Sequence, residues 1–345
     1  MQRSKYRQIK ASLMKMPNVI GVGKGYKTID GLETDQECVV VLVEKKVAPE
    51  DLPRSARIPP LFRGEVTDVV EVGRIKALLP DGPDGAETLE APEAPDESAA
   101  PDTPPHGAST AVFDPYATVA RNTRIRPAPG GVSIGHPDIT AGTLGSVVWS
   151  IETGEPLILS NNHVLAASST LETGMPLNEV PILQPGTFDG GTVEEDTIGT
   201  LFRFVPLRPG GFNRFDAALA RPLNPDDVTP EILDIGTIST ITDPKLRMQV
   251  RKSGRSSGLT SGRISLIDAD IEVDYGLFLL TFTNQVISNI FSRGGDSGSV
   301  IVGPDNTAVG LLFAGSDIIT AFCPMRPLAE MLGFTFENPG GASSS

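Results

Sequence analysis

The feature that most constrains the fold of this chain is a serine-bearing glycine turn that runs directly into a β-branched segment. Residues 292–302 read Ser-Arg-Gly-Gly-Asp-Ser-Gly-Ser-Val-Ile-Val. Glycine permits tight turns, and Val-Ile-Val favours a buried strand. The pattern predicts that Ser297 stands clear of the backbone and that the amides of Gly295 and Ser297 form an oxyanion hole. Because glycine turns with a serine often have no catalytic role, the interpretation depends on whether the chain also offers a base and a carboxylate for Ser297.

The composition favours many short strands. The 345 residues include 36 glycines and 30 prolines, and only 6% are aromatic. This balance favours turns and strands over long helices, and the length allows two or three domains. No apolar run is long enough to cross a membrane, and the basic start of the chain lacks the apolar core of a signal peptide. We therefore expect a cytoplasmic protein without membrane association.

Charge and cysteine content exclude several classes of function. The net charge is −14, but eight acidic residues fall between positions 81 and 105, so the folded parts are only mildly acidic. This argues against a nucleic-acid partner, which needs a basic face. Cys38 and Cys323 are the only cysteines, so we expect buried thiols rather than a disulfide framework. Without a Cys/His cluster at ligand spacing, neither a metal nor a cofactor is expected.

A serine nucleophile needs a base and an orienting carboxylate. His163 directly follows an apolar segment, Leu-Ile-Leu-Ser, and two asparagines. The other histidines, His106 in a Pro-rich linker and His136 before a proline, are expected to be solvated loop residues. Asp216 lies in the otherwise apolar stretch Phe-Asp-Ala-Ala-Leu-Ala. Burying an acid is costly without a partner, and the Nδ1–H of His163 would serve.

In this order, His163, Asp216 and Ser297 resemble the triad of trypsin-like serine proteases. Gly-Asp-Ser-Gly resembles their nucleophile turn, Asn-Asn-His-Val resembles the histidine turn of the HtrA branch, and residues 250–264 resemble a segment of α-lytic and streptogrisin-type proteases. The resemblance implies a mostly β fold of two antiparallel six-stranded β-barrels, chymotrypsin-like, with His163 and Asp216 on the first barrel and Ser297 on the second. The alternative is three unrelated core or turn residues.

A small N-terminal α/β domain is expected before the barrels. Residues 1–16 predict a helix with Ile9 and Leu13 on one face and its basic residues in solvent. Strands are predicted at 19–26, 37–44 and 67–72. This layout resembles the N-terminal region of the narrow-leaf family of trypsin-like proteins. A substrate-recruiting, an oligomerising and an inhibitory role all stay open.

The first of these strands alternates glycine with other residues. Gly21, Gly23 and Gly25 could suggest a nucleotide site. That motif needs a strand, a turn and a helix, whereas a polar hairpin follows here, so nucleotide binding is not expected.

The chain divides into four predicted parts. Residues 1–80 form the N-terminal domain, and 81–114 form an acidic Pro-rich linker that cannot bury enough apolar surface to fold. Residues 115–338 form the trypsin-like domain. Residues 339–345 form a disordered tail.

The resemblance also implies supporting residues around the nucleophile turn. Lys252 matches the internal basic position that pairs with Asp296 in secreted bacterial proteases, with Arg255 and Arg293 as substitutes. A site supported in this way needs no activating cut. The alternative for this segment is a plain Gly/Ser hairpin.

A substrate-binding strand is expected after the serine, at residues 308–316. Phe291 would form the near wall of a specificity pocket, and Phe313, Ala314 and Gly315 the far wall. Because none of these is charged, we expect a small or medium apolar residue before the cut. Many family members carry a serine near Phe313 that bonds the triad aspartate, and this chain lacks it.

These features together predict a serine endopeptidase that hydrolyses protein or peptide substrates through an acyl-enzyme intermediate. The rival hypothesis is a catalytically weak or inactive protease-fold scaffold that binds peptides and is oligomeric. An esterase would share the same chemistry. The sequence leaves a homo-oligomer open.

Overall fold

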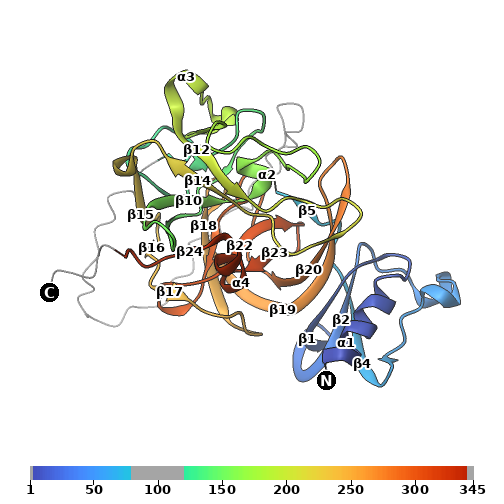
Figure 1. The fold of residues 1–345 in the computed structure, drawn as a ribbon. Coiled ribbons are helices and arrows are strands. Elements are labelled where there is room, and N and C mark those ends of the chain that lie inside the picture. The colour runs from blue at the N-terminus through green and yellow to red at the C-terminus, as the bar shows by residue number, and fades with distance from the viewer. Residues whose placement is uncertain (1–2, 79–119, 340–345) are drawn as a thin grey trace, which may run out of the picture.

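The computed structural model describes residues 3–78 and 120–339 (Figure 1). The chain is mostly β, as predicted, with several sheets and short helices. The predicted linker, His106 and nearly all of the predicted tail lie outside the described residues. Cys38 and Cys323 are both buried and free, as expected.

The first barrel is built on a six-stranded sheet. Its strand order is β11-β12-β14-β10-β9-β24, and every neighbouring pair is antiparallel. Alternating apolar side chains fill its interior, because successive residues of a strand point to opposite faces. The strands are β9 (Ser146–Ser150), β10 (Pro156–Ser160), β11 (Pro181–Leu183), β12 (Thr197–Phe204), β14 (Ala218–Pro222) and β24 (Phe334–Thr335).

Short elements border this sheet. Strand β15 pairs with β16 and with β6, and β7 pairs with β8. They are β6 (Ala128–Gly130), β7 (Ser133–Ile134), β8 (Gly142–Thr143), β15 (Val228–Ile232), β16 (Gly236–Thr237), α2 (Asn162–Leu165) and α3 (Val193–Asp196).

The second barrel belongs to a larger, 13-stranded sheet. Its central element is the 17-residue strand β19, which pairs with β18, β20 and β1. The second-barrel elements are β13 (Phe212–Asn213), β17 (Thr240–Ile241), β18 (Gln249–Gly254), β19 (Gly258–Asp274), β20 (Leu279–Ser288), β21 (Val300–Val302), β22 (Thr307–Gly315), β23 (Thr320–Pro324) and α4 (Met325–Leu332).

The N-terminal unit extends the same sheet. Strand β1 lies antiparallel to β19 and β2, and β4 lies parallel to β2 (Figure 1). One sheet therefore runs through both parts, and the division at residue 80 stays a prediction. The elements are α1 (Arg3–Leu13), β1 (Val19–Ile29), β2 (Leu32–Val43), β3 (Leu61–Phe62), β4 (Glu65–Glu71) and β5 (Lys76–Ala77).

The glycines of β1 allow its close approach to β19. A Cβ on Gly25 would lie 2.5 Å from Cδ2 of Leu266, and one on Gly23 would lie 3.0 Å from Cβ of Ala269. Real side chains at these positions would force the strands apart. The glycine pattern thus serves strand packing.

Helix α1 departs from the prediction at Lys10. Ile9 and Leu13 are buried as expected, but Lys10 is only 4% exposed, so the prediction of fully solvated basic residues is wrong here. The Lys10 Nζ lies 2.7 Å from Asp270 Oδ1 and 3.2 Å from Asp268 Oδ1, both on β19. A buried ammonium needs such carboxylate partners. This ion-pair cluster fixes the N-terminal unit to the second barrel.

His136 also differs from its expected solvated position, because it is only 6% exposed. Its amide donates to the carbonyl of Val164 at 2.8 Å, which fixes the loop that carries His136 to helix α2. The ring Nδ1 accepts a hydrogen bond from the Asp138 amide at 3.0 Å. Burial lowers the pKa of this histidine. These hydrogen bonds are with backbone groups, which gives His136 a structural role.

Candidate active site

Two asparagines fix the turn that carries His163. Strand β10 ends at Ser160, and α2 begins two residues later. The Asn161 side chain donates to the backbone carbonyl of Asp216 at 2.6 Å, and the Asn162 side chain donates to that of Val205 at 2.7 Å. Val205 directly follows β12 and Asp216 lies just before β14, so these two bonds tie the turn that carries His163 to the neighbouring segments of the same sheet.

His163 and Asp216 are in direct contact and both 0% exposed. The ring Nδ1 forms a hydrogen bond with Oδ2 of Asp216, and the backbone amide of His163 donates to Oδ1 at 3.1 Å. The opposite ring nitrogen, Nε2, has no partner among the described residues. This arrangement fixes the tautomer through Nδ1 and leaves Nε2 free to accept a proton.

Tyr275 is a third contact of Asp216 that the sequence did not reveal. Its hydroxyl donates to Oδ2 at 2.5 Å, and its ring meets the His163 ring edge-on, with centroids 6.0 Å apart. Burial, with the charge of Asp216, raises the pKa of Tyr275 well above its usual value, so the phenol stays a donor. Asp216 thus accepts a hydrogen bond from Tyr275, whereas the resemblance implied a serine near Phe313, which this chain lacks. No motif marks Tyr275, because it follows β19 in an ordinary turn.

The turn around Ser297 has the expected glycine conformations. Gly295 and Gly298 have φ angles of 93° and 95°, where a side chain would be strained. The Gly295 amide donates to the carbonyl of Leu78 at 2.9 Å, which places an N-terminal residue at the predicted oxyanion donor. The Ser297 hydroxyl donates to the Phe313 carbonyl at 3.3 Å rather than to His163.

Gly142 marks the place where the two barrels meet. A Cβ on Gly142 would lie 2.4 Å from Cγ2 of Val164 and 3.1 Å from the carbonyl oxygen of Ser297. The residue after His163 and the backbone of Ser297 therefore pack against the same point. This junction brings the turn that carries His163 beside the turn that carries Ser297.

Lys252 and Asp296 are paired beneath the turn. The Nζ lies 3.3 Å from Oδ2 of Asp296, and both side chains are fully buried. Asp296 Oδ1 also accepts the amides of Ser256 and Ser257, each at 3.0 Å. Gly254 leaves room for this carboxylate, since a Cβ there would lie 2.4 Å from Oδ1. The segment is thus a hairpin that also caps Asp296.

The two predicted substitutes for Lys252 have other partners. Arg255 forms a bidentate ion pair with Asp189, on the first-barrel side. The Arg293 guanidinium lies over the ring of Phe291 at 5.2 Å.

The predicted pocket residues divide into two groups. Phe313, Ala314 and Gly315 are buried at the end of β22, where β5 pairs with Ala314 and Gly315. Phe291 is 53% exposed. The structure therefore brings the predicted far wall, but not the Phe291 side chain, to the buried part of the site.

Among residues 3–78 and 120–339, no group of three or more His, Cys, Asp or Glu side chains could hold a metal ion. No helix in the same ranges is long and apolar enough to cross a membrane.

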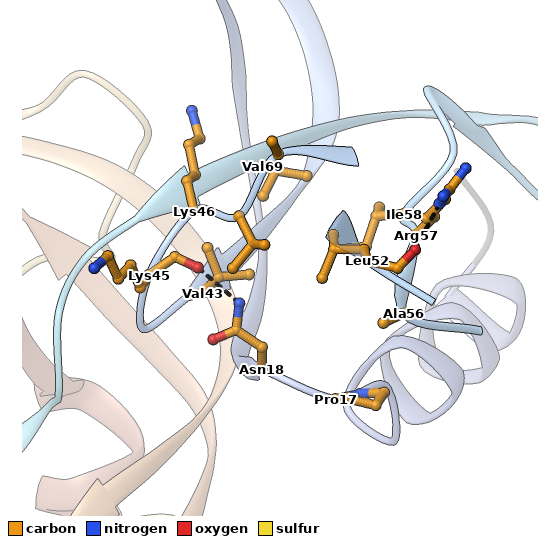
Figure 2. A pocket seen from close by; sticks show the side chains of 12 residues that line it. Pro17, Asn18, Val43, Lys45, Lys46, Leu52, Ala56, Arg57, Ile58 and Val69 are labelled. Atoms are coloured by element: carbon orange, nitrogen blue, oxygen red, sulfur yellow. Dashed lines mark hydrogen bonds between the residues drawn. The ribbon is translucent and has the colours of Figure 1, made fainter. Parts of the chain in front are cut away.

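A separate pocket of about 420 Å³ lies within the N-terminal unit, and Figure 2 shows its lining. There the Asn18 side chain donates to the Lys45 carbonyl at 2.7 Å. Its lining includes the cationic residues Lys45, Lys46 and Arg57 but neither a histidine nor a carboxylate, and none of His163, Asp216 and Ser297 lines it.

The solved structures similar to this chain include bacterial serine proteases of the chymotrypsin fold. Thermobifida fusca Protease A is 21% identical, with a TM-score of 0.43, over 60% of this chain and 96% of that one. Nocardiopsis Protease is 17% identical, with a TM-score of 0.43, over 60% and 97%. Alpha-lytic protease homolog N4 is 16% identical, with a TM-score of 0.44, over 61% and 99%.

No protein-family model and no curated protein matches the chain. The similarity to the solved structures concerns the fold alone.

Proposed function

We propose that this protein is a serine endopeptidase with Ser297 as nucleophile, His163 as general base and Asp216 as the carboxylate that orients the histidine. The observation that carries the proposal is the buried His163–Asp216 pair. Among the described residues, Nε2 of His163 has no hydrogen-bond partner, and the turn that carries this ring packs beside Ser297. A fixed tautomer with a free Nε2 is what a proton acceptor for a serine requires.

The proposed reaction has two stages. The Ser297 oxygen attacks a peptide carbonyl while His163 Nε2 takes its proton, and His163 then gives this proton to the leaving amine. The Gly295 amide, with that of Ser297, would stabilise the oxyanion, and one such donor typically lowers the barrier by about 3 kcal/mol. Water then hydrolyses the acyl-enzyme. Substrates would be proteins or peptides.

One observation favours the rival scaffold hypothesis. The Ser297 hydroxyl donates to the Phe313 carbonyl, so the nucleophile and base are not hydrogen-bonded here. Under our proposal, rotation about the Ser297 Cα–Cβ bond breaks this bond before reaction. Catalytic hydrogen bonds commonly tighten only when substrate binds.

Labelling with a fluorophosphonate probe tests the proposal. We expect stoichiometric labelling of the wild type and none of Ser297→Ala. Ser288→Ala is the matched control, because Ser288 is also a buried serine and its hydroxyl has no hydrogen-bond partner in the part of the chain that the structure describes. The Gly295 amide, a proposed oxyanion donor, is hydrogen-bonded to the Leu78 carbonyl. The variant Leu78→Asp, which should weaken the packing of this residue, is therefore labelled in parallel. Absence of label from folded wild type and from folded Leu78→Asp would favour the scaffold.

The cytoplasmic location and the homo-oligomer stay predictions from the sequence. Size-exclusion chromatography with light scattering would test the second directly.

A further inference from the structure

The last described part of the N-terminal unit leaves that unit and crosses the second barrel. The carbonyl of Val72 accepts the Ser316 hydroxyl at 2.5 Å, and that of Ile75 accepts the Asp274 amide at 2.9 Å. Strand β5 then pairs antiparallel with the end of β22. In Figure 1, β5 lies apart from α1, β1, β2 and β4, among the barrel strands. Residues 72–78 thus form a strap over the candidate active site.

The end of the strap has the backbone contacts of a bound peptide. The Leu78 amide donates to the Phe313 carbonyl at 3.3 Å, and the Leu78 carbonyl accepts the Gly295 amide at 2.9 Å. Extended peptides bind an exposed strand edge through such main-chain bonds, and pockets select their side chains. The Leu78 carbonyl is therefore held at the turn that carries Ser297.

The Leu78 side chain fills an apolar pocket. It is only 9% exposed and packs in a cluster that includes Ile290 and Val286. Its Cδ1 lies 3.4 Å from where a Cβ of Gly315 would stand, an ordinary contact distance, so Leu78 lies against Gly315 at the end of β22. Lys76, two residues earlier, is exposed. The contacts therefore select the residue at position 78 and not that at position 76.

We propose that the chain is its own first substrate and cuts the peptide bond between Leu78 and Leu79. This inference rests on the proposed function and names its substrate class: an extended segment with a leucine-sized apolar residue before the cut. Lys10 and β1 hold the N-terminal unit on the second barrel, which keeps the strap in place.

The step balances without any reagent other than water. The Ser297 oxygen bonds to the Leu78 carbonyl carbon, and its proton passes to His163 Nε2. The carbon–nitrogen bond to residue 79 then breaks, and that nitrogen leaves as an amine with the proton from His163. Water, deprotonated by His163, hydrolyses the ester, frees the Leu78 carboxylate and restores Ser297.

The strap also explains the burial of the site. His163 and Ser297 are both 0% exposed while residues 76–78 lie on β22. An external peptide that needs the same strand edge is excluded until the strap leaves it, so the Lys252–Asp296 pair removes the need for a cut at the nucleophile turn but not at the strap. Since the strap belongs to the same chain, its cleavage is unimolecular.

Intact mass and N-terminal sequencing of full-length protein test the proposal during incubation at two concentrations tenfold apart. We expect fragments 1–78 and 79–345 from the wild type, at a rate independent of concentration. Ser297→Ala should stay intact. Leu78→Asp should be cut at least a hundredfold more slowly, because it places a charge in an apolar pocket. Lys76→Ser is the matched control and should be cut like the wild type.

Several results would overturn the proposal: an intact wild type, a cut at another bond, cleavage of Ser297→Ala, or a rate that rises with concentration. Probe labelling then separates two failures. If the wild type stays intact but Leu78→Asp is labelled at Ser297, the peptidase proposal stands and self-cleavage fails. If folded Leu78→Asp is not labelled either, both proposals fail.

Discussion

Each barrel buries one aspartate completely, and the two carboxylates are stabilised in different ways. Asp296 in the second barrel has a fixed cation, with Lys252 at 3.3 Å, and backbone amides from Ser256 and Ser257. Asp216 in the first barrel is bonded instead to the ring and amide of His163 and to the hydroxyl of Tyr275.

The difference follows from what each carboxylate holds. Asp296 holds a backbone turn that need not change charge, so a permanent ion pair fits. A lysine beside Asp216 would oppose the positive charge that a protonated His163 carries. Neutral donors such as Tyr275 satisfy Asp216 and leave its charge available to the imidazolium. One aspartate is thus suited to a structural role, and the other to the proposed chemistry.

The largest expected effect comes from Asp216→Asn. An asparagine cannot stabilise the imidazolium and favours the wrong tautomer, so we expect kcat to fall about ten-thousandfold. Hydrolysis of a fluorogenic peptide ending in Ala-Leu would measure it, with circular dichroism to verify the fold. A loss below tenfold in a folded variant would remove Asp216 from the proposed machinery.

Lys252→Met should act on stability. The substitution leaves the buried charge of Asp296 without its cation, and removing one partner of a buried pair typically costs about 3–5 kcal/mol. Urea unfolding measures this loss. The double variant Lys252→Met/Asp296→Asn should recover much of it, because no buried charge remains. If the double variant is no more stable than the single one, charge pairing is not the cause.

Tyr275→Phe tests the neutral donor of the first barrel. Loss of a hydrogen bond to a charged group costs about 1.5–3 kcal/mol, so we expect kcat to fall about tenfold or more while KM is unchanged. Steady-state kinetics on the same peptide would show this split. A change in KM alone would make Tyr275 part of substrate binding rather than a positioning residue.

The smallest effect concerns Cys323, near Asp216. Burial, with the charge of Asp216, raises the pKa of this thiol to about 12 from an ordinary 9.0. Between these two pKa values the folded state keeps a proton that the unfolded chain loses. The contribution of the Cys323 thiol to the free energy of unfolding is therefore fully present below pH 9 and is lost as the pH rises towards 12.

Urea unfolding of wild type and Cys323→Ala at pH 8, 9 and 10 would check this pH dependence. Between pH 8 and 10, stability should fall by about 1 kcal/mol more in the wild type than in the variant. Equal slopes would contradict the raised pKa.

Local patterns predicted much of the fold and the candidate site. The helix α1 and the strands β1, β2 and β4 follow from apolar spacing and β-branched runs close together in the sequence. Each of His163, Asp216 and Ser297 lies in a short recognisable segment. Lys252 could be paired with Asp296 only through a family resemblance, which carried spatial information that the residues alone do not.

Other contacts escaped sequence reasoning because they join distant segments. Tyr275 bonds a carboxylate 59 positions away, and Lys10 pairs with residues about 260 positions away. Neither residue lies in a pattern that differs from an ordinary turn or a solvated helix face. The Leu78 contacts are of the same kind, since an Ala-Leu dipeptide carries no local signal.

The sequence by itself determined the types of element and the chemical groups available: many strands, a glycine turn with a serine, one histidine after a strand and one acid in an apolar segment. Backbone preference and side-chain chemistry are local properties, so they can be read from neighbours in the chain. Only the tertiary structure decided which charges meet, which hydroxyl satisfies Asp216 and which segment lies on β22. Burial and hydrogen bonding depend on neighbours in space, and those are set when the sheets close.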